Sequence, residues 1–187
     1  ALHMPYTVSD NEVDNVKIQD ITSSSAKVRA GKRANNWVYW YLDRELPENY
    51  LIGFDAVIRS FLTEFQLAFN HTDIANRLRF QVVDNAYVSF DVVRDGFFFN
   101  KMFTKPFSFD MHKKYSIKLL VCSNVYSFIV DDRVLLSIKD NTGISKGGFV
   151  FVLWDKDGVG DMAVDIDNFQ IREVSVVTSN NDGQNRV

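Results

Sequence analysis

The chain has 187 residues, of which 46% are hydrophobic and 24% are charged, a balance typical of one globular domain. Its 21 basic and 24 acidic residues leave a formal net charge of -3, with no basic run that could follow a phosphate backbone. This argues against a nucleic-acid partner. No run approaches the roughly 18 apolar residues of a membrane span, and one cysteine excludes an intrachain disulfide.

The sequence indicates a single domain at residues 5–178. Residues 1–4, Ala-Leu-His-Met, read as a cloning remnant. Residues 179–187 are polar and contain no aromatic residue, so they read as a flexible tail or linker.

Alternation of apolar and polar residues predicts a series of short β-strands along the chain. The aromatic content of 14% is consistent with this prediction. One helical turn is expected at His71–Asn76, because Thr72 and Asp73 can cap it. The expected strands are Val16–Ile21, Lys27–Ala30, Asn36–Leu42, Leu51–Leu62, Glu64–Asn70, Leu78–Val83, Ala86–Val92, Phe97–Phe103, Tyr115–Cys122, Tyr126–Val130, Arg133–Ile138, Gly148–Trp154 and Met162–Glu173.

Short polar breaks, such as Asp84–Asn85 and Asp131–Asp132, separate these strands. Such breaks suit antiparallel hairpins and are too short for helical crossovers between parallel strands. We therefore expect an all-β fold, a two-sheet antiparallel β-sandwich. Two strands, Trp37–Leu42 and Phe149–Trp154, are apolar on both faces, so the face turned away from the core must be covered by a loop, a partner or a ligand.

The last strand changes phase in its middle. Val164 and Ile166 alternate with polar residues, and the apolar positions then resume at Phe169 and Ile171. Since successive side chains of a strand point to opposite faces, this change requires an extra residue. The sequence therefore predicts a β-bulge at Asp167–Asn168.

Several segments together resemble a concanavalin A-like or laminin G-like jelly roll. They are Tyr115–Val121, the Cys-Ser-Asn turn, Val125–Ile138, Gly147–Trp154 and the run Asp165-Ile-Asp-Asn-Phe-Gln-Ile. The resemblance covers Trp37 to Val174 and is strongest to the non-catalytic sandwich modules of bacterial glycoside hydrolases. It implies a concanavalin-like jelly roll and carbohydrate as the partner. It also implies an extracellular or cell-surface location, with the chain joined to other domains of a larger secreted protein.

In sandwiches of this kind an acidic residue at the kink of the last strand ligates a structural calcium ion, and that position corresponds to Asp165 or Asp167. A bulge frees carbonyl oxygens, which join carboxylates around the ion. The run Val13-Asp14-Asn15 repeats the pattern near the other end, so Asp14 is a further candidate ligand if the first and last strands are neighbours. The alternative is that these Asp-Asn pairs are turn residues that bond their own backbone, as expected of a third copy, Asp84–Asn85.

A second candidate calcium loop follows Trp154. It places carboxylates at Asp155, Asp157 and Asp161 around two glycines. A simple Asp-Gly hairpin explains the same residues.

Aromatic residues near the first of the two apolar strands are candidate sugar platforms. Pyranose rings stack on aromatic planes, and their hydroxyls need polar neighbours. The candidate ligand-binding residues are Trp37, Tyr39, Trp40, Tyr41, Arg44 and Trp154. Burial in the core is the alternative for each tryptophan.

Catalytic motifs are missing from the sequence. No run places two glutamates around an aspartate as retaining hydrolases of this fold do, and no His/Tyr pair suggests a lyase. The sequence therefore favours a non-catalytic carbohydrate-binding module. A hydrolase or lyase using Asp91, Arg94 or Glu64 is the alternative, and a protein-interaction or adhesion sandwich is the second alternative.

Overall fold

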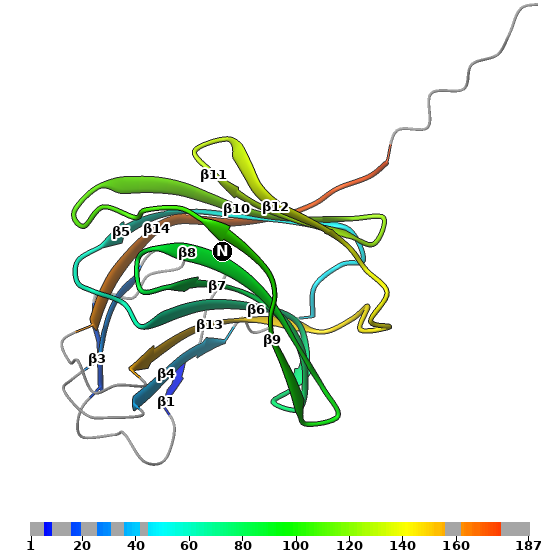
Figure 1. The fold of residues 1–187 in the computed structure, drawn as a ribbon, viewed down its shortest axis with the longest axis horizontal. Helices are drawn as coiled ribbons and strands as arrows, with labels where there is room; N and C mark the ends of the chain where they lie inside the picture. The colour runs from blue at the N-terminus through cyan, green and yellow to red at the C-terminus, as the bar shows by residue number, and fades with distance from the viewer. Residues whose placement is uncertain are drawn as a thin grey trace, which may run out of the picture.

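The computed structural model describes the backbone of residues 6–8, 16–19, 26–30, 36–41, 45–155 and 162–176. Side chains are described for residues 45–155 and 162–176, except that of Lys101. Within these ranges fourteen strands form two antiparallel sheets, which Figure 1 shows as stacked layers. The predicted two-sheet β-sandwich is confirmed.

Sheet A contains seven strands in the order β1-β4-β13-β6-β7-β8-β9. The strands β6 to β9 are joined in turn by hairpins, whereas β13 inserts between β4 and β6 from a distant part of the chain. Its strands are β1 (Tyr6–Val8), β4 (Asn36–Tyr41), β6 (Glu64–Asp73), β7 (Asn76–Val83), β8 (Tyr87–Arg94), β9 (Phe97–Pro106) and β13 (Gly148–Asp155).

Sheet B also contains seven strands, in the order β12-β11-β10-β5-β14-β3-β2. The last strand of the described chain, β14, lies between β5 and β3, so it is an inner strand of the sheet. The strands are β2 (Val16–Gln19), β3 (Ala26–Ala30), β5 (Tyr50–Ile58), β10 (Lys114–Cys122), β11 (Val125–Val130), β12 (Arg133–Lys139) and β14 (Met162–Glu173).

One hydrophobic core fills the space between the sheets. Alternate residues of facing strands supply it, and its phenylalanine rings pack edge-on and stacked: Phe54 and Phe151 are 4.9 Å apart between ring centroids, and Phe65 and Phe151 are 5.7 Å apart. Rings in contact stabilise a core beyond the area that they bury. Most of the aromatic side chains in the described ranges thus lie in this interior.

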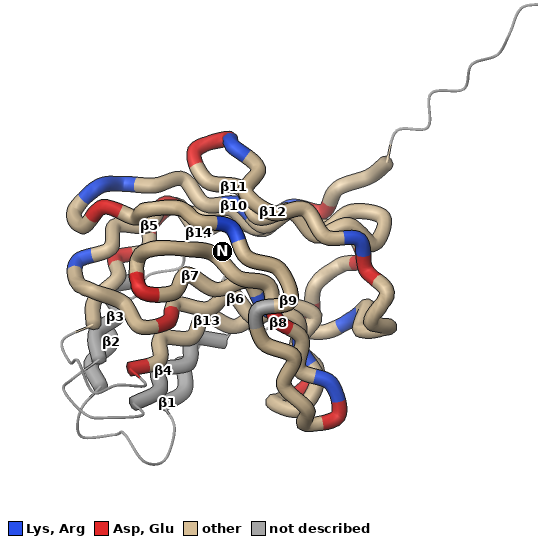
Figure 2. The backbone as a smooth tube through the Cα atoms, in the orientation of Figure 1, with Lys and Arg blue, Asp and Glu red and all other residues tan. Residues whose placement is uncertain are grey.

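The hairpin turns are made by polar residues in the left-handed backbone region. Asp131 and Asp132 both have positive φ, as do Ser123 and Asn124. Tight hairpin turns need such angles to match the twist of the strands, and Asp and Asn tolerate them best after glycine. Figure 2 shows charged residues of both signs concentrated at such turns.

The bulge in the last strand is confirmed. The register between β14 and β5 shifts between Asp167 and Gln170, and Asn168 has a φ of 51°. The shift lets Phe169 return to the core after Ile166, which is the phase change seen in the sequence.

Three other predictions are wrong. Residues 71–76 form no helical turn, because β6 runs to Asp73 and pairs with Asn76 in a hairpin. The strand predicted at Leu51–Leu62 ends at Ile58, after which the chain crosses to sheet A. The first and last predicted strands are not neighbours either, since β3 lies between β2 and β14 in sheet B.

Candidate functional site

The two sheets differ on the faces that they turn away from the core. In sheet B, β5 and β10 alternate strictly between buried and partly exposed residues. In sheet A, the middle of β6, β7, β8 and β13 is buried on both faces. The outer face of sheet A is therefore a second buried layer, and its chemistry is different from that of the core.

Polar side chains form a row across this outer face. We define the polar row as Glu64 and Gln66 of β6, Arg79 and Gln81 of β7, and Ser89 and Asp91 of β8, each no more than 7% exposed. The register places Gln66 opposite Gln81, and Gln81 opposite Ser89. Beside the row lies a small apolar cluster of Ala68, Val150 and Val152. Buried polar and apolar groups thus share one sheet face.

Asp91 is the centre of the polar row. Its carboxylate accepts hydrogen bonds from Arg79 Nε at 3.2 Å, from Gln81 Nε2 and from Ser89 Oγ at 3.5 Å. Arg79 also donates to Asn100 Oδ1 at 2.8 Å. Buried charges persist where such partners compensate the loss of hydration, so this network fixes the orientation of the side chains in the row.

Two amide oxygens of the row have no partner. Gln66 donates through Nε2 to Glu64 Oε2 at 2.8 Å and Gln81 donates to Asp91, yet Gln66 Oε1 and Gln81 Oε1 accept no hydrogen bond from the described part of the chain. A buried acceptor without a donor costs about 1–3 kcal/mol. Both oxygens are themselves buried, so a hydroxyl-bearing molecule can satisfy them only where the groups that cover the face move aside.

Aromatic residues flank the polar row on two sides. On the β9 side, Phe98 is 54% exposed, and the guanidinium carbons of Arg77 and Arg79 lie 5.8 and 5.5 Å from its ring centroid. On the β13 side, Trp154 is partly exposed and pairs in register with Glu64. The predicted platform residue Trp154 therefore lies on the outer face, next to the row.

Most of the other predicted ligand-binding residues are described only through their backbone. The register pairs position 37 with Trp154, position 39 with Val152 and position 41 with Val150, all on the outer face of β13. Position 40 pairs instead with Phe151, a core residue. The side chains of Trp37, Tyr39, Trp40 and Tyr41, and the whole of Arg44, lie outside the described residues.

The predicted metal ligands of the last strand have other partners. Asp165 accepts from Arg59 Nε at 2.8 Å, and Asp167 Oδ1 accepts from the backbone N–H of Asn168 at 2.8 Å. Asn168 in turn donates to Asp55, which also pairs with Lys114. The contact of Asp167 is local, as expected of a bulge residue, whereas those of Asp165 and Asn168 join β14 to β5 and to Arg59 just after it.

The remaining predicted ligands do not complete a calcium site in the described part of the chain. Asp155 is fully buried at the end of β13, and Asp14, Asp157 and Asp161 lie outside the described residues. Among the residues that are described, no three His, Cys, Asp or Glu side chains are grouped so that they could hold a metal ion. Three of the six predicted ligands thus lie outside the described residues, and the calcium site stays a prediction.

The residues considered for catalysis divide between two places. Glu64 and Asp91 belong to the polar row, and Asp91 is already bound by three donors. Arg94 lies at the exposed tip of the β8–β9 hairpin beside Asp95.

No helix in the described ranges has the length and hydropathy of a membrane-spanning segment.

Comparison with known proteins supports the architecture. No protein-family model matches the chain, and no curated protein sequence matches it. Among solved structures, the carbohydrate-binding module CBM66 from Bacillus subtilis is similar with a TM-score of 0.67 and 17% identity, over 90% of this chain and 95% of that one. A Bacillus subtilis protein of unknown function with a galectin-like fold has a TM-score of 0.69 and 10% identity, over 92% and 89%.

Sheep galectin-11, solved in complex with glycerol, is similar with a TM-score of 0.55 and 14% identity, over 75% of this chain and 98% of that chain. At these identities the likeness concerns the fold. The predicted resemblance is confirmed at that level: the chain has the concanavalin-like jelly-roll fold, a sandwich that galectins and carbohydrate-binding modules also adopt.

Proposed function

We propose that this chain is a non-catalytic carbohydrate-binding module whose ligand lies on the outer face of sheet A. The observation that carries the proposal is the polar row, in which Gln66 and Gln81 each leave an amide oxygen without a partner and Glu64 pairs in register with the aromatic residue Trp154. Sugars present apolar C–H faces and hydroxyl donors together, and a face with both aromatic and acceptor groups complements them.

The chemistry of the face favours a neutral glycan. The charged groups of the face already have partners: Arg79 binds Asp91, both Arg77 and Arg79 lie over Phe98, and Glu64 accepts a hydrogen bond from Gln66. The fold similarity to CBM66 and to a galectin supports the same ligand class. An extracellular location within a larger secreted protein belongs to this proposal.

Binding to a panel of soluble neutral and acidic polysaccharides, by affinity gel electrophoresis and calorimetry, tests the proposal. We expect retardation by at least one neutral polysaccharide, and at least a tenfold loss of affinity in Gln66→Leu and Trp154→Ala. Gln170→Leu, on the outer face of sheet B, is the matched control and should bind like the parent. Equal affinity in all three variants would refute the proposed face.

The same panel separates the module from an enzyme of this fold. Release of reducing sugar or of unsaturated product would indicate a hydrolase or lyase, and then Asp91→Asn and Glu64→Gln should remove the activity. Retardation without any product supports the module.

A second candidate function, protein interaction, rests on β9, the edge strand of sheet A. Five of its large apolar side chains are 45–69% exposed: Phe97, Phe98, Phe99, Met102 and Phe103. A long apolar edge strand pairs readily with another strand. Sedimentation velocity showing an oligomer that sugars do not perturb would favour this alternative.

A further inference from the structure

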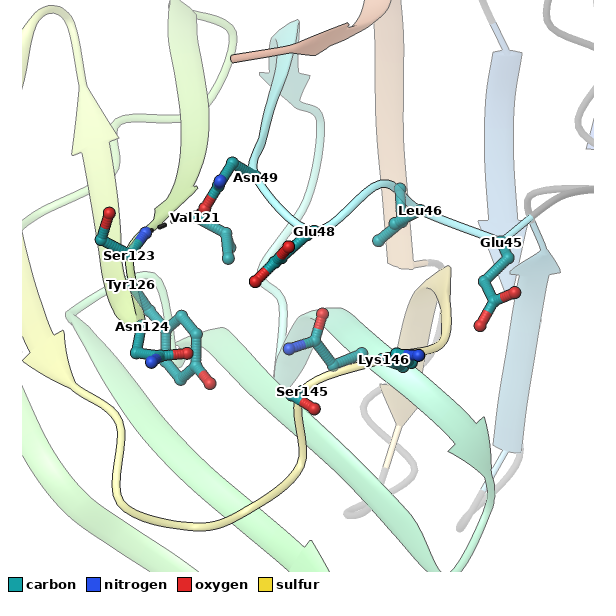
Figure 3. A pocket seen from close by; sticks show the side chains of 11 residues that line it. Glu45, Leu46, Glu48, Asn49, Val121, Ser123, Asn124, Tyr126, Ser145 and Lys146 are labelled. Atoms are coloured by element: carbon teal, nitrogen blue, oxygen red, sulfur yellow. Dashed lines mark hydrogen bonds between the residues drawn. The ribbon is translucent and has the colours of Figure 1, made fainter. Parts of the chain in front are cut away.

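A hollow lies at one end of the sandwich, away from the polar row. This sandwich-end pocket has a volume of about 450 Å³, and Glu48, Asn70, Asn124, Tyr126, Ser145 and Lys146 are among its lining residues. They come from the crossover before β5, from β6, from the β10–β11 hairpin and from the crossover before β13. Figure 3 shows these side chains around one open space. None of the six belongs to the polar row.

The walls of the pocket are fixed to one another. The backbone N–H of Leu46 donates to the carbonyl of Gly147 at 3.0 Å, which joins the two crossovers. The N–H of Ser123 donates to Asn49 Oδ1 at 2.9 Å, which joins the hairpin to the first crossover. A pocket held open in this way loses little conformational entropy when a ligand binds.

Gly147 makes the close approach of the second crossover possible. Its φ is 139°, and a Cβ added there would lie 2.6 Å from backbone atoms of Asn70 and His71. Only glycine fits both the angle and the space. At the floor, Asn70 is bound on both sides, by the hydroxyl of Tyr50 at 2.9 Å and through its own Nδ2 to the carbonyl of Ile144 at 3.1 Å. The floor is therefore rigid as well.

Four side chains around the pocket carry polar groups that are free to bind. Within the described chain, the side chains of Glu48, Asn124, Ser145 and Lys146 make no hydrogen bond or ion pair. They offer a carboxylate, an amide, a hydroxyl and an ammonium group around one space. A ligand that both donates and accepts hydrogen bonds in several directions matches them, and a polyhydroxylated ring does so.

We propose that the sandwich-end pocket is a second binding site, which takes one terminal sugar residue of a glycan. The sugar class rests on the proposed function of the outer face, whereas the location rests on the pocket alone. A volume of about 450 Å³ suits a single ring in an open hollow. An elongated face and an end pocket on one module would bind chain interiors and chain ends, and glycans engaging both would gain avidity.

Titration of the ¹⁵N-labelled protein with glucose, galactose, mannose, fructose and N-acetylglucosamine tests the pocket. We expect one of them to shift the amide resonances of residues 48, 124 and 145, with millimolar affinity. Glu48→Gln and Asn124→Gly, where glycine keeps the positive φ of position 124, should each weaken this binding about tenfold or more, as the loss of one charge-assisted or amide hydrogen bond predicts. Both residues are exposed, so these variants should fold, and Glu173→Gln is the matched control.

The outcomes separate the two sites. If polysaccharides bind and Gln66→Leu weakens them, yet no monosaccharide shifts the pocket resonances, the pocket proposal is overturned and the proposed function stands. If a monosaccharide binds the pocket while Gln66→Leu and Trp154→Ala leave polysaccharide binding unchanged, the outer face is overturned and the pocket stands. Shifts confined to the polar row would also overturn the pocket.

Discussion

Removal of the Asp91 carboxylate is the sharpest test of the buried polar row. Asp91 is 0% exposed, and it is the partner of Arg79, which is 3% exposed. In Asp91→Ala the guanidinium keeps its hydrogen bond to Asn100 and its place over Phe98, but it loses the only negative charge with which the described structure shows it paired. Breaking a buried ion pair by removing one partner typically costs about 3–5 kcal/mol.

Urea unfolding of the parent and of Asp91→Ala measures this loss. With an m-value of about 2–3 kcal/mol per M, the midpoint should fall by roughly 1–2 M while m stays constant. Removing both charges in Arg79→Met/Asp91→Leu should restore most of the stability, because a buried pair replaced by apolar groups is often neutral or stabilising. The argument for a buried ion pair would be refuted by a loss of stability below about 1 kcal/mol in Asp91→Ala. It would also be refuted by a double variant that is less stable than both single variants.

Four further predictions follow from single contacts. Asp165→Asn should lower the free energy of unfolding by less than about 1 kcal/mol, because the side chains of Arg59 and Asp165 are 42% and 20% exposed. A loss of stability that appears only in the presence of calcium would instead indicate a metal site. Burial, and after it the nearby Arg77, lowers the pKa of His71 in the folded protein. The free energy of unfolding should therefore decrease as the pH falls below the unfolded-state pKa of about 6.5. In His71→Gln the free energy of unfolding should change less with pH between about 7 and 5. Burial raises the pKa of Tyr50 well above its ordinary value, and Tyr126 adds to this. Tyr50→Phe should therefore leave the absorbance titration at 295 nm unchanged until the protein unfolds. Loss of the signal of one tyrosine near a pH of about 10 would contradict the burial of Tyr50. Phe99→Lys on the β9 edge should reduce any self-association seen by sedimentation, since a charge on an edge strand opposes pairing, and an unchanged oligomer would place the contact elsewhere.

The sheets and turns could be predicted because their causes are local. Strict alternation in β5 and β10 reflects one buried and one open face, and the phase change at Asp167–Asn168 is visible as a bulge in the sequence itself. The hairpins follow from polar residues that accept positive φ, such as Asp131 and Asp132. Each of these signals lies within a few residues of the structure that it determines.

The polar row could not be predicted, because its burial is not local. In sequence, Gln66, Gln81 and Ser89 alternate with core residues and are typical of an open sheet face, like Lys118 of sheet B. The register that aligns them comes from three strands, and their burial depends on what packs around that face. The prediction of Trp154 as a sugar platform did point to the same face, because Trp154 pairs in register with Glu64. The sandwich-end pocket was missed for a related reason, since segments some 75 and 100 residues apart build it.

The contrast between the sheets suggests why the polar row is present. Sheet B shows that this fold is stable with an ordinary half-open face, on which Gly53 and Lys118 lie. A buried network of two charges and several amides adds less stability than apolar side chains of the same volume would, so the architecture does not require it. Proteins tend to hold such groups where function needs them. The double variant Arg79→Met/Asp91→Leu joins the two arguments: if the row exists for a ligand, this variant should unfold near the parent's midpoint and yet lose polysaccharide retardation. Retained binding would mean that the row serves the fold alone.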